Sequence, residues 1–132
     1  MGERRRILIV DDDPVFVKST SLVLEAHGYD VDSARNGAEG LAKIEQDPPD
    51  LVLLDVMMSY LLEGVEVSRQ MMTKRGVQDI PIIMVTSILD TEYREVFPLD
   101  QYLHIHSWLN KPVAPDDLMA EVERALPEAK EE

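Results

Sequence analysis

Acidic side chains stand directly after two apolar segments of this sequence. Asp11 and Asp12 follow "ILIV", and Asp55 follows "LVLL". Neighbouring carboxylates repel one another, and a carboxylate beside a core is costly to desolvate, so a cluster of them requires a counter-charge. Carboxylate oxygens are hard ligands that suit Mg²⁺, which keeps several waters and often bridges to phosphate. The pattern therefore indicates a divalent-cation site.

Two other polar residues also end apolar segments. Thr86 closes "PIIMVT", and Lys111 closes "WLNK". Each of these polar residues, taken singly, is compatible with an ordinary loop or the start of a helix. Taken together, the acids, the hydroxyl and the ammonium form the constellation that a phosphate site needs. Asp13 is different: because Pro14 suits the first turn of a helix, we interpret Asp13 as a helix N-cap.

An alternation of strands and helices positions these residues. The hydrophobic pattern predicts a first helix that begins at Pro14 and stops before Gly28, and further helices over 36–47, 65–75 and 115–126. It predicts strands over 5–10, 29–34, 50–55, 80–87 and 106–112. Strands that are apolar on both faces are typical of a parallel sheet covered by helices on both sides. The carboxyl ends of such strands meet at one edge, where sites form.

The same pattern predicts which helical residues face the core. In the first helix we expect an inward stripe of Val15, Leu22, Val23 and Ala26. In the second helix we expect Ala38, Leu41 and Ala42 to point inward.

Composition excludes several classes of function. Asp and Glu number 26 against 13 Lys and Arg, and the net charge of −13 argues against nucleic acid or an anionic membrane as a direct partner. There is no cysteine for a disulfide or a zinc site, and no apolar stretch is long enough to span a bilayer. We expect a cytoplasmic chain with one domain over 1–126 and a flexible acidic tail over 127–132.

Four motifs occur in a fixed order: "LIVDDDP", "DLVLLDVMM", "PIIMVTS" and "WLNKP". In this order and spacing the sequence resembles the response-regulator receiver domains of two-component signalling, over nearly the whole chain. The resemblance implies a flavodoxin-like α/β fold: a doubly wound, five-stranded parallel sheet in the order 2-1-3-4-5, with helices on both faces.

The resemblance also implies roles for the strand-end acids. Asp55 would be the phosphoacceptor, taking a phosphoryl group from a histidine kinase or a histidine phosphotransfer protein. Asp11, Asp12 and Asp55 would hold Mg²⁺, together with the backbone carbonyl of Met57. Such a domain catalyses its own phosphorylation and dephosphorylation, but acts primarily as a switch for an unknown downstream protein.

Further roles implied by the resemblance concern the last two strands. Thr86 would hydrogen-bond the acyl phosphate, and Lys111 would pair with it. Thr86 and Trp108 would form the switch, although Trp108 could also be a plain packing residue. The peptide bond between Lys111 and Pro112 would be cis.

Two segments depart from the family pattern. The loop over 59–63 has Ser59 where Pro is usual, and it is one residue longer. The segment over 89–106 contains Pro98, which interrupts a helix, so we expect an irregular fourth helix.

Three alternatives remain beside a phosphorylatable receiver. A degenerate pseudo-receiver would act as an interaction module without phosphorylation. A phosphatase of the haloacid dehalogenase type would place its nucleophile in Asp11–Asp13, but it would leave Asp55 without a role. A nucleotide-binding domain is disfavoured, because no glycine-rich phosphate loop follows the first strand. The chain could be free-standing or one domain of a longer protein.

Overall fold

The computed structural model describes residues 4–56, 63–86 and 106–126, with the backbone alone at Val65 and Thr86. In these residues a single parallel sheet has the strand order β2-β1-β3-β4-β5. The strands are β1 (Arg6–Val10), β2 (Asp30–Ala34), β3 (Leu51–Asp55), β4 (Ile82–Thr86) and β5 (Ser107–Asn110). The predicted strand order is confirmed.

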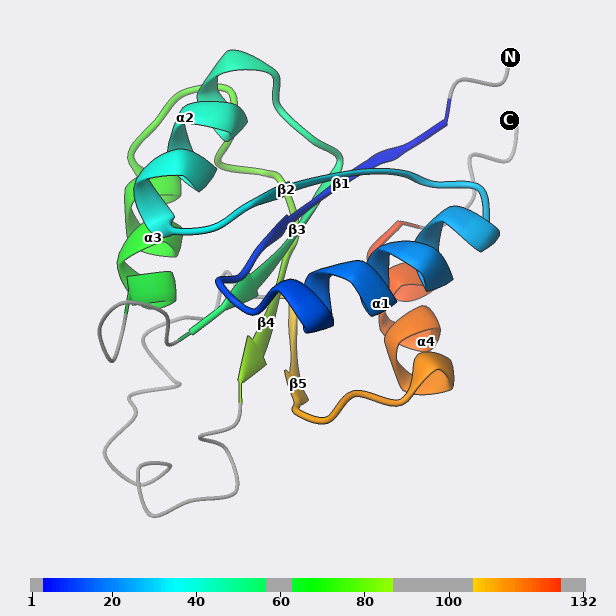
Figure 1. Ribbon diagram of the computed structural model, residues 1–132. Coiled ribbons are helices and arrows are strands. Elements are labelled where there is room, and N and C mark those ends of the chain that lie inside the picture. Colours follow the sequence, from blue (N-terminus) through cyan, green and yellow to red (C-terminus); the bar gives the residue numbers. More distant parts are fainter. Residues whose placement is uncertain (1–3, 57–62, 87–105, 127–132) are drawn as a thin grey trace.

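Helices cover both faces of the sheet. They are α1 (Pro14–Ala26), α2 (Gly37–Gln46), α3 (Glu63–Met72) and α4 (Pro115–Ala125). Figure 1 shows α2 and α3 on one side of the sheet and α1 and α4 on the other. The fold is therefore doubly wound, as predicted. The sequence also predicted an irregular helix over 89–106, between β4 and β5 and distinct from α4. This segment lies almost entirely outside the described residues.

The core consists of two apolar layers, one on each face of the sheet. Successive side chains of a strand point to opposite faces, so β1 sends Leu8 and Val10 under α2 and α3, and Ile7 and Ile9 under α1 and α4. The strand β3 is buried along its whole length. This burial on both faces explains why the central strands are apolar throughout and why polar residues appear only where the strands end.

The first helix begins and ends as predicted. The side chain of Asp13 accepts hydrogen bonds from the backbone N–H groups of Val15 and Phe16, at 3.0 and 3.3 Å. Gly28 has a φ of 93°, the left-handed conformation that glycine adopts readily after a helix. The β1–α1 turn is therefore fixed by a helix cap directly beside the acids.

The predicted inward face of α1 is wrong. Val15 and Leu22 are 75% and 60% exposed, while the residues of α1 that are buried are Thr20 and Leu24. Val23 is partly buried as expected. The helix carries apolar residues on more than one face, so the pattern alone could not determine which face meets the sheet.

The predicted inward residues of α2 are also largely wrong. Ala38 and Ala42 are exposed, and Gly37, Gly40 and Ile44 are buried instead. A Cβ atom at Gly40 would lie 2.9 Å from a methyl group of Val10. The helix thus lies close to β1 at Gly40, because a larger residue there would collide with Val10.

None of the helices in the described residues has the length and apolarity that crossing a membrane requires.

Candidate functional site

The polar residues that end the strands meet at one edge of the sheet. The strands β1, β3, β4 and β5 are neighbours in the sheet order, and all run in the same direction. Their registers pair Val10 with Leu54, Asp55 with Val85, and Thr86 with Asn110. The residues that follow β1 and β5 therefore come to the same edge as Asp55, as expected for a site in an open parallel sheet.

Three carboxylates form a compact cluster at this edge. Asp11, Asp12 and Asp55 each place a carboxylate oxygen within 4.8 Å of the other two. Asp11 and Asp55 are 1% and 6% exposed, whereas Asp12 is open to solvent. The structure thus brings together the three acids that the sequence predicted as metal ligands. Because Asp12 is exposed, the cluster can be reached from solvent.

The cluster fits a hard divalent cation. Its donors are all carboxylate oxygens, the ligand type that Mg²⁺ prefers. The buried Oδ2 atom of Asp11 accepts no hydrogen bond of favourable geometry from the described residues, although an ammonium lies close to it. A buried oxygen in this state gains from a further positive ligand.

Lys111 supplies positive charge to the same cluster. Its Nζ atom lies 3.0 Å from Oδ2 of Asp11 and 3.6 Å from Oδ2 of Asp55. Burial by itself lowers the pKa of Lys111. The contact with Asp11 and the negative charges of Asp55, Asp11 and Asp13 outweigh burial and raise the pKa above its ordinary value of 10.5. The ammonium therefore stays protonated at neutral pH.

An aromatic ring also holds the ammonium. Nζ of Lys111 lies 4.6 Å from the centre of the Phe16 ring, within the range of a cation–π contact. Phe16 is in the first turn of α1, and its backbone N–H donates to the side chain of the cap residue Asp13. This contact was not predicted from the sequence, because it joins two residues that are far apart in the chain.

The β1–α1 turn orients the carboxylate of Asp11. The backbone N–H of Asp11 donates to the carbonyl of Ala34 at 3.0 Å, which extends the pairing of β1 with β2. The backbone N–H of Asp13 donates to Oδ1 of Asp11 at 2.9 Å. Asp13 therefore caps α1 with its side chain and positions Asp11 with its backbone.

The backbone around Asp55 is held from two sides. The N–H of Val56 donates to the carbonyl of Val85 at 3.2 Å, and the N–H of Gly64 donates to the carbonyl of Val56 at 2.8 Å. A Cβ atom at Gly64 would overlap the carbonyl group of Asp55, so only glycine fits there. The sequence predicted Gly64 as the start of a helix, but gave no sign of this close approach.

The structure places the remaining predicted residues to different degrees. The bond between Lys111 and Pro112 is cis, as predicted. Thr86 is the last residue of β4, and the role of its hydroxyl stays a prediction. Trp108 lies opposite Met84 and is partly buried against the core under α2 and α3. Met57 and nearly all of the 59–63 loop lie outside the described residues.

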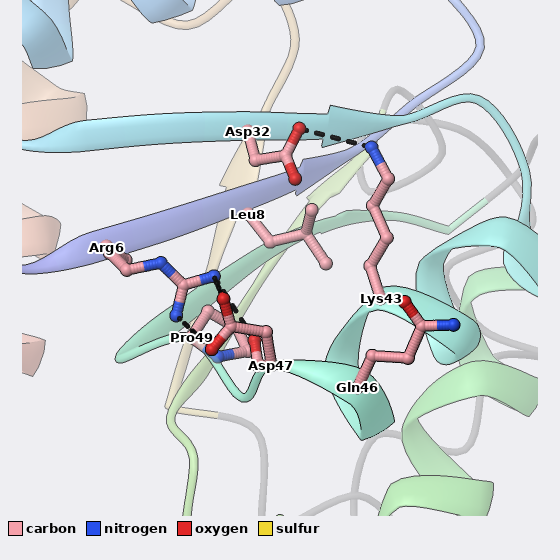
Figure 2. Close-up of a pocket in the computed structure, with 7 residues that line it drawn as sticks. All are labelled: Arg6, Leu8, Asp32, Lys43, Gln46, Asp47 and Pro49. Carbon is pink, nitrogen blue, oxygen red and sulfur yellow. Dashed lines mark hydrogen bonds and ion pairs between the residues drawn. The ribbon is translucent and has the colours of Figure 1, made fainter.

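A separate hollow of about 230 Å³ lies between α2 and the strands β1 and β2 (Figure 2). Its charged groups are already paired with one another. Lys43 contacts Asp32 at 3.1 Å, and Arg6 contacts Asp47 at 3.2 Å. Arg6 also donates to the backbone carbonyls of Asp47 and Pro48. In this hollow the two cations are matched by two carboxylates, whereas the acidic cluster has three carboxylates and the single ammonium of Lys111.

Residues 7–123 match the family model described as the response regulator receiver domain. The chain belongs to this family. The receiver domain is 36% identical to the protein PilH of Pseudomonas aeruginosa over 121 residues, which cover 92% of this chain and 97% of PilH.

It is 37% identical to the alkaline phosphatase synthesis transcriptional regulatory protein PhoP of Bacillus subtilis, over 92% of this chain. That match covers 48% of PhoP, so the chain spans about half the length of this relative.

Solved structures agree with the family. A CheY-like receiver domain from Methanospirillum hungatei superposes with a TM-score of 0.79 at 35% identity, covering 92% of this chain and 93% of the other. The five-stranded fold of this chain is therefore the receiver fold.

Proposed function

We propose that this receiver domain accepts a phosphoryl group on Asp55, with Mg²⁺ held by Asp11, Asp12, Asp55 and the backbone carbonyl of Met57, and thereby switches a protein-interaction surface. One observation carries the proposal: a buried carboxylate at a strand end has two further carboxylates and the ammonium of Lys111 around it. The proposed domain extends over 1–126, with 127–132 as its tail.

The chemistry requires little from the protein beyond placement and charge. An oxygen of the ionised Asp55 attacks the phosphorus of a phosphohistidine, the new P–O bond forms, and the P–N bond breaks with its electron pair going to the imidazole. No general base is needed, because the carboxylate is already ionised. Negative charge spreads over the three phosphoryl oxygens during transfer, so fixed positive charge nearby lowers the barrier.

Three groups would meet that negative charge. The protonated ammonium of Lys111 lies 3.6 Å from the acceptor carboxylate and would pair with the phosphoryl oxygens. When bound, Mg²⁺ would supply further positive charge to the same oxygens. Thr86 is the last residue of β4, and its hydroxyl would donate a hydrogen bond to the acyl phosphate. With Trp108, it would relay the change.

The phosphodonor would be a histidine kinase or a histidine phosphotransfer protein. An apolar surface on α1, formed by Pro14, Val15, Lys18, Ser19 and Leu22, lies on the helix that begins beside the acids. We call it the α1 surface. Its exposed Val15 and Leu22 can pack against a partner that brings its phosphohistidine to Asp55. The net charge of −13 favours a protein, over nucleic acid or an anionic membrane, as the direct partner of this chain.

Labelling with a small phosphodonor tests the proposal. The wild type and Asp55→Asn are incubated with acetyl phosphate, with Mg²⁺ or with EDTA, and their intact masses are measured. We expect one phosphoryl group on the wild type with Mg²⁺, and none on Asp55→Asn or in EDTA. Absence of label on the wild type would contradict the proposal.

A Mg²⁺ titration is a second experiment, and it separates the proposed receiver from the alternative of a pseudo-receiver. Mg²⁺ is added to the wild type and to Asp55→Asn while the fluorescence of Trp108 is recorded. A receiver binds the ion and is labelled. A pseudo-receiver that serves only as an interaction module neither binds the ion at this cluster nor is labelled.

A further inference from the structure

Glu63 is a buried carboxylate that lies outside the acidic cluster. It is the first residue of α3 and is 6% exposed. Its Oε2 atom accepts a hydrogen bond from the backbone N–H of Gly37 at 2.6 Å, a short distance that is typical of a charge-assisted hydrogen bond. Since burying a carboxylate is unfavourable without strong partners, this contact between two helices needs an explanation.

Glu63 lies at the beginning of two helices. Gly37 is the first residue of α2, and the N–H groups of a first helical turn have no partners within the helix. The cap residue Asn36 accepts from the N–H of Glu39, and Glu63 accepts from that of Gly37. Glu63 also lies in the first turn of α3. Its carboxylate is thus close to the positive ends of two helices.

The contact depends on close packing between the helices. A Cβ atom at Gly37 would lie 2.8 Å from a methyl group of Val67 and 3.0 Å from Oε2 of Glu63. Glycine is therefore the residue that lets α2 begin against the side chain of Glu63. The carboxylate cannot move away from α2 without opening this packed contact.

The next residue carries the link to the acceptor strand. Gly64 donates its N–H to the carbonyl of Val56 at 2.8 Å, and its Cα lies directly against the carbonyl of Asp55. The start of α2, the carboxylate of Glu63, the backbone of Gly64 and the end of β3 thus form one continuous set of contacts. Gly64, the neighbour of Glu63 in the chain, is therefore the residue that contacts the backbone of Asp55.

We propose that Glu63 is a positioning residue for the phosphorylation of Asp55. Its carboxylate, bound at the start of α2, holds Gly64 against the backbone of Asp55 and so keeps the acceptor carboxylate facing Asp11 and Lys111. This inference rests on the proposed function, because it concerns the geometry of the same acceptor.

The test compares three substitutions. Glu63→Gln keeps a side-chain oxygen that accepts the hydrogen bond of Gly37, whereas Glu63→Leu has a similar size and no acceptor. Ile44→Val is the control, because it weakens the buried face of the same helix α2 without touching Glu63 or Asp55. Each protein is labelled by acetyl phosphate with Mg²⁺ over a range of donor concentrations, at a temperature where circular dichroism finds it folded.

We expect Glu63→Leu to lower the maximal labelling rate about tenfold, because a small misplacement of a reacting group reduces the rate strongly. The donor concentration at half the maximal rate should stay unchanged. Glu63→Gln should restore most of the rate, and Ile44→Val should keep it. A merely structural role would reduce the rates of Glu63→Leu and Ile44→Val alike.

The inference is overturned if Glu63→Leu is labelled at the wild-type rate, or if Ile44→Val slows labelling as much as Glu63→Leu. Should Glu63→Leu fail to fold, the series is repeated with Glu63→Ala in sucrose, which favours folding without replacing the hydrogen bond. A wild-type rate for folded Glu63→Ala then overturns the inference. A wild type that takes no label overturns the proposed function, and this inference with it.

Discussion

Replacing Lys111 by Met removes the positive charge at the acidic edge of the sheet. Asp11 and Asp55, which are 1% and 6% exposed, would lose an ammonium that lies 3.0 and 3.6 Å from their carboxylates. Methionine has a similar length, and its thioether packs well on an aromatic ring, so the contact with Phe16 would be kept in another form. The substitution therefore reports mainly on charge.

The expected loss of stability follows from the exposure of the site. Breaking a fully buried ion pair costs about 3–5 kcal/mol. The side chain of Lys111 is 21% exposed, and water reaches the cluster through Asp12. We therefore expect a loss of about 1.5–3 kcal/mol, as for hydrogen bonds to charged groups.

Lys74→Met is the matched control. Lys74 pairs with Glu45 at 3.3 Å, but the two side chains are 39% and 46% exposed, against 21% for Lys111. An exposed pair contributes about 0–1 kcal/mol, so this substitution should change the stability little.

Urea unfolding in EDTA and in Mg²⁺ provides the assay. In EDTA, Lys111→Met should unfold at a lower urea concentration than the wild type and Lys74→Met. A ligand that binds only the native state raises its stability, and removal of a competing ammonium should tighten cation binding. Mg²⁺ should therefore stabilise Lys111→Met more than the wild type. The reasoning is refuted if Lys111→Met and the wild type have the same midpoint in EDTA, or if Mg²⁺ stabilises both equally.

Three further predictions concern other parts of the site. Gly64→Ala should lower the free energy of unfolding by about 1–3 kcal/mol and slow labelling, because its Cβ would overlap the carbonyl of Asp55; urea unfolding and labelling by acetyl phosphate measure this. On the α1 surface, Leu22→Asp should slow phosphoryl transfer from a histidine kinase but not from acetyl phosphate. If the kinase phosphorylates Leu22→Asp and the wild type at the same rate, the α1 surface does not bind the phosphodonor. The third concerns pH. Since the pKa of Lys111 is raised, its ion pairs stabilise the fold fully below pH 10.5 and are lost as the pH rises further. In EDTA, the urea midpoint of the wild type should thus fall more steeply above pH 10.5 than that of Lys111→Met, and parallel curves would argue against this.

The sheet and most of the site could be predicted because local patterns encode them. Strands buried on both faces are apolar along their length, so Asp11 and Asp55 stand out where the strands end. The cap of α1 likewise follows from two adjacent residues, Asp13 and Pro14. In each case the signal lies within a few residues.

What could not be predicted depends on packing between distant segments. Leu22 is apolar but 60% exposed, because the sheet meets another face of α1. Glu63 is buried, although an acid in the first turn of a helix is usually solvated. Nothing in the neighbouring sequence indicates that Glu63 accepts a hydrogen bond from Gly37. The contact of Phe16 with Lys111 also forms only once the sheet has assembled.

Mapping the phosphoryl group tests the central claim most directly. The wild type is labelled by acetyl phosphate with Mg²⁺, the acyl phosphate is reduced with borohydride, and the modified residue is located by peptide mass spectrometry. The account predicts modification at Asp55 alone. Modification at Asp11, Asp12 or Asp13 would contradict it. Phosphohistidine, detected separately with a reagent for phosphoimidazoles, would contradict it as well.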